Sequence, residues 1–298
     1  MRYIFLGVLI SCSVLAPLTR ATPVLAIAGS STLAATDDGS TGLINIGFTM
    51  KLGATSYTQL FVNNNGNISF GAAVSTYTPA ALSTLTSPMI AAYLGDVDTR
   101  GTGSGVTTYG ATTFTTLDNI VRNAFVVNWN NVGYYNRKTD KLDTFQLLFV
   151  DRGAGNFDVM YNYEKILWET GDASGGVGGL GGTSARVGFT SGTAASAVEF
   201  AGSGTPGALL NGGSKAQVNY TNVPLSGLYT RDAGRYVVSF SGGTGSMAAP
   251  TVAPEPSSVV LVGAAVGAFG LLGWRKRRSV LAGRRQPRTT TLMAPDVA

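Results

Sequence analysis

The chain has 298 residues, of which 44% are hydrophobic and 12% charged, and its formal net charge at pH 7 is +5. It has no histidine and a single cysteine, which excludes histidine-dependent catalysis, histidine-ligated zinc and an internal disulfide bond. The basic residues gather at the C-terminus, and acidic residues slightly outnumber basic ones between Gly29 and Pro254. This central part lacks the positive charge of a nucleic-acid-binding surface, so we expect no nucleic-acid partner.

The N-terminus has the layout of a secretory signal peptide. One arginine precedes an apolar stretch from Tyr3 to about Leu15, and small residues follow it. The best cleavage site is Ala26-Ile27-Ala28, and Pro17 interrupts the far side of a stretch that is already short for a membrane anchor. We therefore expect residues 1–28 to be a signal peptide, removed during export together with the single cysteine.

Between the two ends the sequence predicts an all-β domain. Hydrophobic and aromatic residues alternate with polar ones in several short segments, which places one set of side chains on one face of a strand. The clearest segments are NAFVVNWNN, DTFQLLFVD, NFDVMYNY and GRYVVSF. A long helical period is missing between Ser30 and Pro250, and Gly- and Asn-rich turns separate the segments. We expect a β-sandwich-like extracellular domain over residues 29–245, with its core at 60–240.

The segment LFVNNNGNISF, residues 60–70, predicts a β-hairpin. Asn65-Gly66 is a preferred pair for a two-residue type I′ turn, in which both positions need a positive φ. Such a turn pairs Asn63 with Ile68 and brings Ile68 onto the same face as Phe61.

Asp96 and Asp98 are the strongest candidate ligand residues. They lie two apart beside a glycine-rich loop, so on an extended strand both carboxylates point to one side. Two hard oxygen ligands of this kind could hold Ca²⁺, which takes six to eight oxygens. In the structural alternative, Asp98 caps the turn and pairs with Arg100. The two carboxylates as a glycoside hydrolase acid/base pair are a weaker interpretation, because no second motif supports a substrate cleft.

Two other segments could contact ligands. GGVGGLGG, at 175–182, contains the glycine spacing of a nucleotide-binding loop but lacks the strand before it and the helix after it, so we expect a flexible surface loop. Tyr134 and Tyr135 could stack on sugar rings, although a position in the core or at a sheet edge is the simpler interpretation.

The C-terminal part predicts a membrane anchor. Residues 257–274 carry no charge, and as a helix they would be about 27 Å long, close to the thickness of a bilayer core. A linker at 246–256 precedes this transmembrane helix and a basic tail at 275–298 follows it on the cytoplasmic side. The flanking residues are Pro254, Glu255 and Pro256 before the span and Arg275, Lys276, Arg277 and Arg278 after it.

This arrangement resembles a PEP-CTERM sorting signal. The resemblance implies an exosortase partner in the inner membrane of a Gram-negative bacterium, which recognises the Pro-Glu-Pro triplet while the basic cluster sets the orientation. It also implies a chain that is transiently anchored in that membrane and then reaches the cell surface or extracellular matrix. Residues 279–298 extend past the usual end of such signals.

The exported part resembles a nidogen-like (NIDO) domain from Leu60 to Phe240. The matching segments are FVNNNGNISFG, MIAAYLGDVDTRGTGSGVTTY, DTFQLLFVDRGAGNFDVMYNYEKILWETG, ARVGFTSG and GRYVVSF. The resemblance implies a non-catalytic adhesion or interaction protein whose partner is a cell-surface or matrix component. Two alternatives stay open: a carbohydrate-binding module for an extracellular polysaccharide matrix, and a glycoside hydrolase that uses carboxylates alone.

Overall fold

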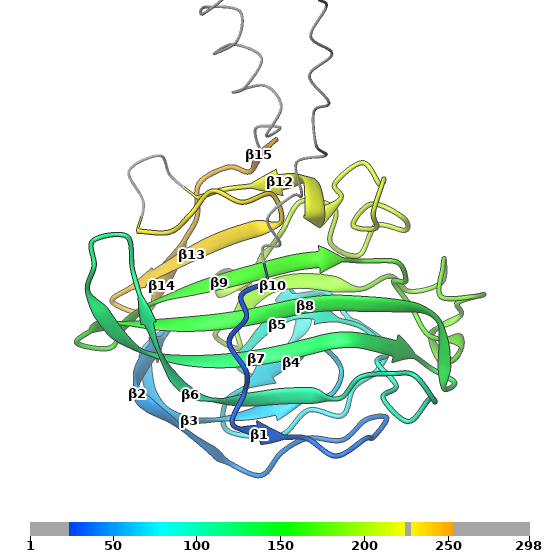
Figure 1. The fold of residues 1–298 in the computed structure, drawn as a ribbon, viewed down its shortest axis with the longest axis horizontal. Coiled ribbons are helices and arrows are strands. Elements are labelled where there is room, and N and C mark those ends of the chain that lie inside the picture. The colour runs from blue at the N-terminus through cyan, green and yellow to red at the C-terminus, as the bar shows by residue number, and fades with distance from the viewer. Residues whose placement is uncertain (1–23, 224–227, 253–298) are drawn as a thin grey trace, which may run out of the picture. The chain divides into compact units, whose positions relative to one another are not determined.

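A computed structural model describes residues 24–223 and 228–252 of the chain. Across these residues strands dominate, and the helical elements are 3₁₀ turns at Leu82–Thr84, Asp172–Ser174, Ala194–Ser196 and Gln217–Asn219. Two antiparallel sheets pack face to face, with the larger one across the front of the view in Figure 1. The predicted all-β sandwich is therefore the observed fold.

The larger sheet has seven strands in the order β1-β6-β7-β8-β9-β13-β14. Their bounds are β1 Ser31–Thr32, β6 Thr107–Thr115, β7 Val121–Tyr134, β8 Lys138–Gly153, β9 Asn156–Lys165, β13 Arg235–Ser241 and β14 Thr244–Ser246.

The second sheet has six strands in the order β11-β10-β5-β4-β3-β2. Their bounds are β11 Val198–Glu199, β10 Arg186–Thr190, β5 Met89–Leu94, β4 Asn67–Ser69, β3 Thr55–Asn63 and β2 Ile44–Leu52. A separate pair joins β12, Tyr220–Thr221, to β15, Thr251–Val252.

The main core lies between the two sheets. In each of β7, β8, β9 and β13, one set of alternate side chains points into this core, as the period of two predicts. Trp129 and Phe145, neighbours on β7 and β8, stack with ring centroids 5.2 Å apart. Aromatic pairs of this kind stabilise a sheet beyond the area that they bury.

The outer face of the large sheet is also covered. Ala124, Val126, Leu148 and Met160 form a second buried cluster there, against which Leu25 and other apolar side chains pack. In Figure 1 the blue N-terminal segment crosses the front of β8 and β7. The central strands are thus hydrophobic on both faces because both faces are buried.

The compact unit spans residues 21–253, which is wider at both ends than the predicted 29–245. Residues 24–28 pack on the sheet. At the other end, β14 ends at the first residue of the expected linker at 246–256, and β15 lies inside that linker. The other end segments lie outside the described residues: most of the predicted signal peptide, the Pro-Glu-Pro triplet, the expected transmembrane helix at 257–274 and the basic tail. Among the residues that are described, no helix has the length and hydrophobicity needed to cross a membrane.

The predicted hairpin at 60–70 exists, but its register is shifted by one residue. Asn63 pairs with Asn67, so the loop has three residues and only Gly66 has a positive φ, +73°. The type I′ assignment was therefore wrong; a three-residue loop that ends in a left-handed glycine forms instead. Tertiary contacts hold this loop, because the side chains of Asn64 and Asn65 form hydrogen bonds with Val97 and Asp38, and a Cβ at Gly66 would lie 1.9 Å from the carbonyl oxygen of Tyr93.

Candidate functional site

Three carboxylates meet at the end of the sandwich where β3 turns into β4. Asp37 and Asp38 precede β2, whereas Asp96 follows β5, and one carboxylate oxygen from each lies within 4.8 Å of the others. Residues almost sixty positions apart in the sequence thus form one acidic cluster, which we call the Asp37–Asp38–Asp96 cluster.

Two buried asparagines of the β3–β4 loop hold this cluster together. The Asn64 side chain donates to the carbonyl oxygens of Asp37, at 2.5 Å, and Val97, at 2.6 Å. The Asn65 side chain donates to Oδ1 of Asp38, at 2.8 Å, and accepts from the backbone N–H of Val97, at 3.0 Å. The loop therefore ties the segment before β2 to the segment after β5.

Asp96 is the most buried of the three aspartates. It is only 1% exposed, and its Oδ2 has no hydrogen-bond partner among the described residues. The backbone of Gly171 closes over it, since a Cβ at that position would lie 2.1 Å from Oδ2. Oδ1 of Asp37 is likewise buried and without a hydrogen bond in the described part of the chain. Two buried acceptor oxygens thus lack a donor from residues 24–223 and 228–252.

The electrostatics follow from this crowding. Burial, with the nearby carboxylates of Asp37 and Asp38, raises the pKa of Asp96 to about 7. Burial and the charge of Asp98 raise the pKa of Asp37 to about 6, although Arg100 opposes the shift. The site is therefore short of positive charge.

Asp98 does not share this cluster with Asp96. Its carboxylate accepts hydrogen bonds from the N–H, Nε and Nη2 of Arg100, at 3.0, 2.8 and 2.7 Å, and from the N–H of Arg137, at 2.9 Å. Burial opposes ionisation, but these hydrogen bonds outweigh it and lower the pKa of Asp98. Asp98 therefore caps the turn and pairs with Arg100, as the structural alternative predicted.

The sequence pointed to Asp96 but missed its partners. Asp37-Asp38 is an acidic pair before a glycine, a pattern that is common at turns. Nothing in its sequence spacing indicates that it lies close to Asp96 in the folded chain. Chemically, the cluster offers hard oxygen donors. It does not fit a glycosidase acid/base pair, because a sugar cannot reach a carboxylate on a residue that is 1% exposed.

The glycine-rich segment at 175–182 contains a hydrogen-bonded turn, and the N–H of Gly176 donates to the carbonyl of Gly171, the residue whose backbone covers Asp96, at 3.1 Å. The N–H of Val177 donates to the carbonyl of Leu180 at 3.0 Å, and Gly178 and Gly179 have φ of +60° and +81°. Positive φ at both central positions defines a type I′ turn. Gly179 packs so closely on Trp168 that a Cβ would lie 2.8 Å from the Trp168 Cβ. Val177, the first residue of this turn, is 84% exposed.

Tyr134 cannot stack on a sugar, because it is 1% exposed. Its ring lies 5.7 Å from that of Trp168, and its hydroxyl donates to Oδ1 of Asp140 at 2.7 Å. It is a core residue, as the simpler interpretation held, while Tyr135 is half-buried.

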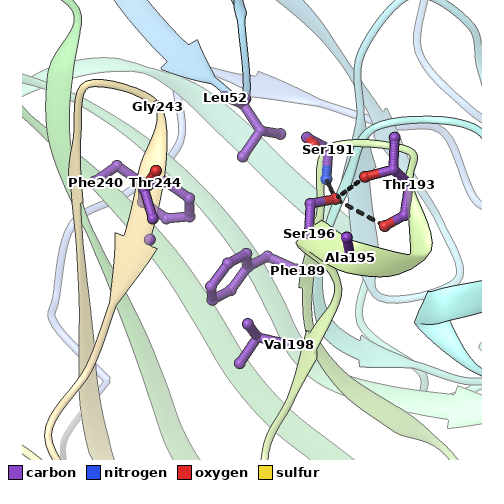
Figure 2. A pocket seen from close by; sticks show the side chains of 12 residues that line it. Leu52, Phe189, Ser191, Thr193, Ala195, Ser196, Val198, Phe240, Gly243 and Thr244 are labelled. Atoms are coloured by element: carbon purple, nitrogen blue, oxygen red, sulfur yellow. Dashed lines mark hydrogen bonds between the residues drawn. The ribbon is translucent and has the colours of Figure 1, made fainter.

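A cavity of about 320 Å³ opens at the opposite end of β3. Figure 2 shows Phe189 and Phe240 at its base, with their rings 4.9 Å apart. On one side, the hydroxyl of Ser196 accepts from the N–H of Ser191 at 3.0 Å and donates to the carbonyl of Thr193 at 2.8 Å. These polar groups bond one another on that side of a cavity whose lining is otherwise a mixture of polar and apolar residues.

The family is decided by a match to the nidogen-like domain model over residues 58–230. The chain belongs to the nidogen-like domain family. A second model, the PEP-CTERM protein-sorting motif, matches residues 252–278 and includes the Pro-Glu-Pro triplet and the four basic residues. Both resemblances seen in the sequence are thus confirmed, and they support an exported protein of the cell surface or extracellular matrix. Asp96 falls inside the nidogen-like match, whereas Asp37 and Asp38 precede it.

Curated relatives share the nidogen-like part. Alpha-tectorin of Gallus gallus is 31% identical over 189 residues, which is 57% of this chain and 9% of that protein. Alpha-tectorin of Mus musculus is 31% identical over 198 residues, covering the same shares. Nidogen of Drosophila melanogaster is 28% identical over 165 residues, or 49% of this chain and 12% of the relative. The chain thus spans about a tenth of the length of these relatives. No solved structure gives a significant match.

Proposed function

We propose that this protein is a non-catalytic binding module that adheres to a protein component of the cell surface or extracellular matrix. The observation that carries the proposal is the combination, in one chain, of a nidogen-like domain and a PEP-CTERM sorting motif. The motif supplies the sorting signal of an exported chain, and the domain is the part that would act outside the cell.

The contact surface we favour is the end of the sandwich that carries the glycine-rich turn. Val177 is 84% exposed and Leu180 is 41% exposed, and the turn that holds them is fixed by packing on Trp168. Exposed apolar side chains on a rigid support, surrounded by polar residues, are typical of protein contact sites. This chemistry favours a protein partner over a polysaccharide.

The sorting route follows from the second motif. We infer that an exosortase in the inner membrane of a Gram-negative bacterium recognises Pro254, Glu255 and Pro256, while Arg275, Lys276, Arg277 and Arg278 hold the C-terminus in the cytoplasm. The apolar stretch at 257–274 would then anchor the chain until it is processed.

A binding assay tests the function. Protein recovered from the outside of cells is added to matrix from cells that lack the gene, and the bound fraction is measured against concentration. We expect saturable binding that disappears when the matrix is treated with protease and survives removal of its polysaccharide. Binding that is linear in concentration would contradict the proposal.

A carbohydrate-binding module remains the second candidate, because a surface cavity of about 320 Å³, next to the buried rings of Phe189 and Phe240, could accommodate a sugar. Binding that resists protease but is lost with the polysaccharide would favour this candidate, and a glycan array would then identify the sugar. The third candidate, a carboxylate-based glycoside hydrolase, predicts release of reducing ends from the matrix, which we do not expect.

A further inference from the structure

We propose that the Asp37–Asp38–Asp96 cluster binds one Ca²⁺ ion. The sequence suggested calcium at Asp96 and Asp98, but the hydrogen bonds and ion pair of Asp98 with Arg100 satisfy that carboxylate. The partners of Asp96 are instead two aspartates that precede β2, outside the region matched by the family model.

Two carboxylate oxygens of the cluster are buried without a hydrogen-bond donor among the described residues. Oδ2 of Asp96 and Oδ1 of Asp37 are both buried, and neither has a hydrogen-bond partner among the described residues. Leaving a buried charged acceptor without a partner is costly, and native proteins satisfy such groups with donors, water or ions. Arg100 reaches Oδ2 of Asp37, yet Asp96 forms no ion pair with any described lysine or arginine. A cation between the carboxylates would satisfy both oxygens.

The fold already holds the carboxylates of Asp38 and Asp96 in place. Oδ1 of Asp38 is fixed by Asn65, and the absence of a side chain at Gly171 lets the backbone pack against Oδ2 of Asp96. One carboxylate oxygen from each residue lies within 4.8 Å of the others, and two ligands on opposite sides of one Ca²⁺ would be no farther apart than this, given metal–oxygen distances of about 2.4 Å. A preformed site loses little conformational entropy when it binds.

The chemistry of the three carboxylates favours Ca²⁺ over other metal ions. The three ligands offer only oxygen, and the chain has no histidine, which disfavours zinc, copper and nickel. Ca²⁺ accepts irregular arrangements of six to eight oxygens, whereas Mg²⁺ demands near-octahedral geometry and gives up its water reluctantly. Three carboxylates from two separate segments fit the less demanding ion, with water filling the remaining positions.

Binding would join the segment before β2 to the end of β5. Asn64 already links these segments through the carbonyls of Asp37 and Val97, and the ion would add a second, charged link. Because only the folded chain brings the three aspartates together, Ca²⁺ would stabilise the native state.

The test uses the full chain, purified in detergent at pH 8, where a proton cannot easily take the place of the cation. Calorimetric titration with CaCl₂ should give one site per chain, with a Kd below about 1 mM, the range of extracellular calcium modules. Saturating Ca²⁺ should raise the melting temperature by several degrees, and Mg²⁺ at the same concentration should have a much smaller effect. Asp96→Asn and Asp38→Asn should each weaken binding at least tenfold.

Asp140→Asn is the matched control, because Asp140 is an exposed aspartate paired with Lys141 and lies outside the cluster. It should bind Ca²⁺ as the wild type does. Absence of saturable binding by the wild type at about 10 mM Ca²⁺ would overturn the proposal, as would equal losses in Asp140→Asn and Asp96→Asn. A third outcome would also overturn the proposal: Ca²⁺ leaves the melting temperature of the wild type unchanged, and Asp96→Asn melts at a higher temperature than the wild type. The cluster would then hold a proton and not a cation.

Discussion

The side-chain amide of Gln146 forms hydrogen bonds with both backbone groups of Leu25. Its Oε1 accepts from the Leu25 N–H at 3.2 Å, and its Nε2 donates to the Leu25 carbonyl at 3.0 Å. Gln146 is fully buried on β8 and also bonds Asn128 and Asn162 on the neighbouring strands. The N-terminal segment thus completes a polar row that crosses the outer face of the large sheet.

The first prediction concerns the start of the mature chain. Cleavage after Ala28 would remove Leu25 and leave two hydrogen-bonding atoms of the Gln146 amide without that partner. We therefore expect N-terminal sequencing of exported protein to begin at or before Val24. Exported protein that begins at Gly29 would contradict this.

A matched pair of chains measures the energy involved. A mature chain that begins at Gly29 should be less stable than one that begins at Val24, by roughly 2–4 kcal/mol, because it loses three partly buried hydrogen bonds, two of Leu25 and one of Ile27, and some apolar contact. Urea unfolding of the two chains gives the difference. Equal midpoints would show that the segment is not part of the stable domain.

The second prediction concerns Asp143, which is buried on β8. Its Oδ1 accepts from the N–H groups of Leu167, at 2.6 Å, and Trp168, at 3.2 Å, yet burial still raises the pKa of Asp143 well above its ordinary value. A raised folded-state pKa means that the folded chain holds the proton more tightly than the unfolded chain. This contribution to stability is complete below the unfolded pKa, near 4, and is lost as the pH rises toward the folded value.

Asp143→Asn keeps an acceptor oxygen for both N–H groups and cannot ionise. The stability of the variant relative to the wild type should therefore improve between pH 5 and pH 8, by more than about 1 kcal/mol. Urea unfolding at both pH values checks this. A constant difference between the two proteins would show that Asp143 does not titrate in this range.

The third prediction concerns the glycine-rich turn. Gly179→Ala combines an unfavourable φ of +81° with a Cβ 2.8 Å from that of Trp168, whereas Gly181→Ala has a φ of +74° and open space around it. We expect Gly181→Ala to cost about 1 kcal/mol and Gly179→Ala to cost at least 1 kcal/mol more. Similar unfolding midpoints for the two variants would mean that the turn does not pack on Trp168 as described.

The fourth prediction concerns the contact surface. Val177→Asp places a charge at the exposed first residue of the turn and should weaken binding to the matrix at least tenfold without lowering the melting temperature. Val121→Asp is the control, because Val121 is 65% exposed at the opposite end of β7 and should leave binding unchanged. Equal binding by both variants would remove the turn from the contact surface.

The fifth prediction concerns sorting. Glu255→Ala should leave the chain inserted but unprocessed, so a C-terminal epitope tag should remain on the protein in the inner-membrane fraction. Asp296→Ala, a change of the same kind outside the matched motif, should be processed as the wild type is. Glu255→Ala protein that reaches the cell surface at the wild-type rate would show that the triplet is not read.

Much of the fold follows from local pattern. The alternation in β7, β8, β9 and β13 determines which side chains face the core, and it was read correctly because the period of two acts within a single strand. The loop at Asn64 and Asn65 was read incorrectly, because its geometry depends on contacts with Val97, Asp37 and Asp38, far away in the sequence.

The candidate site shows the same division. Asp96 could be found from its neighbours in the sequence, but the approach of Asp37 and Asp38 is created by the packing of one sheet edge and has no sequence period. Asp98 looked equivalent to Asp96 at a spacing of two, and the hydrogen bonds from Arg100 and Arg137 to Asp98 separate their roles.

A chimera tests whether the nidogen-like domain binds the cell surface or matrix. In cells that lack the gene, residues 24–252 are replaced by an unrelated exported domain, while the two end segments are kept, and the fraction retained on the washed surface and matrix is compared with that of the natural chain. Both chains should be exported and processed equally, but only the natural chain should be retained. Equal retention of the two chains would contradict this.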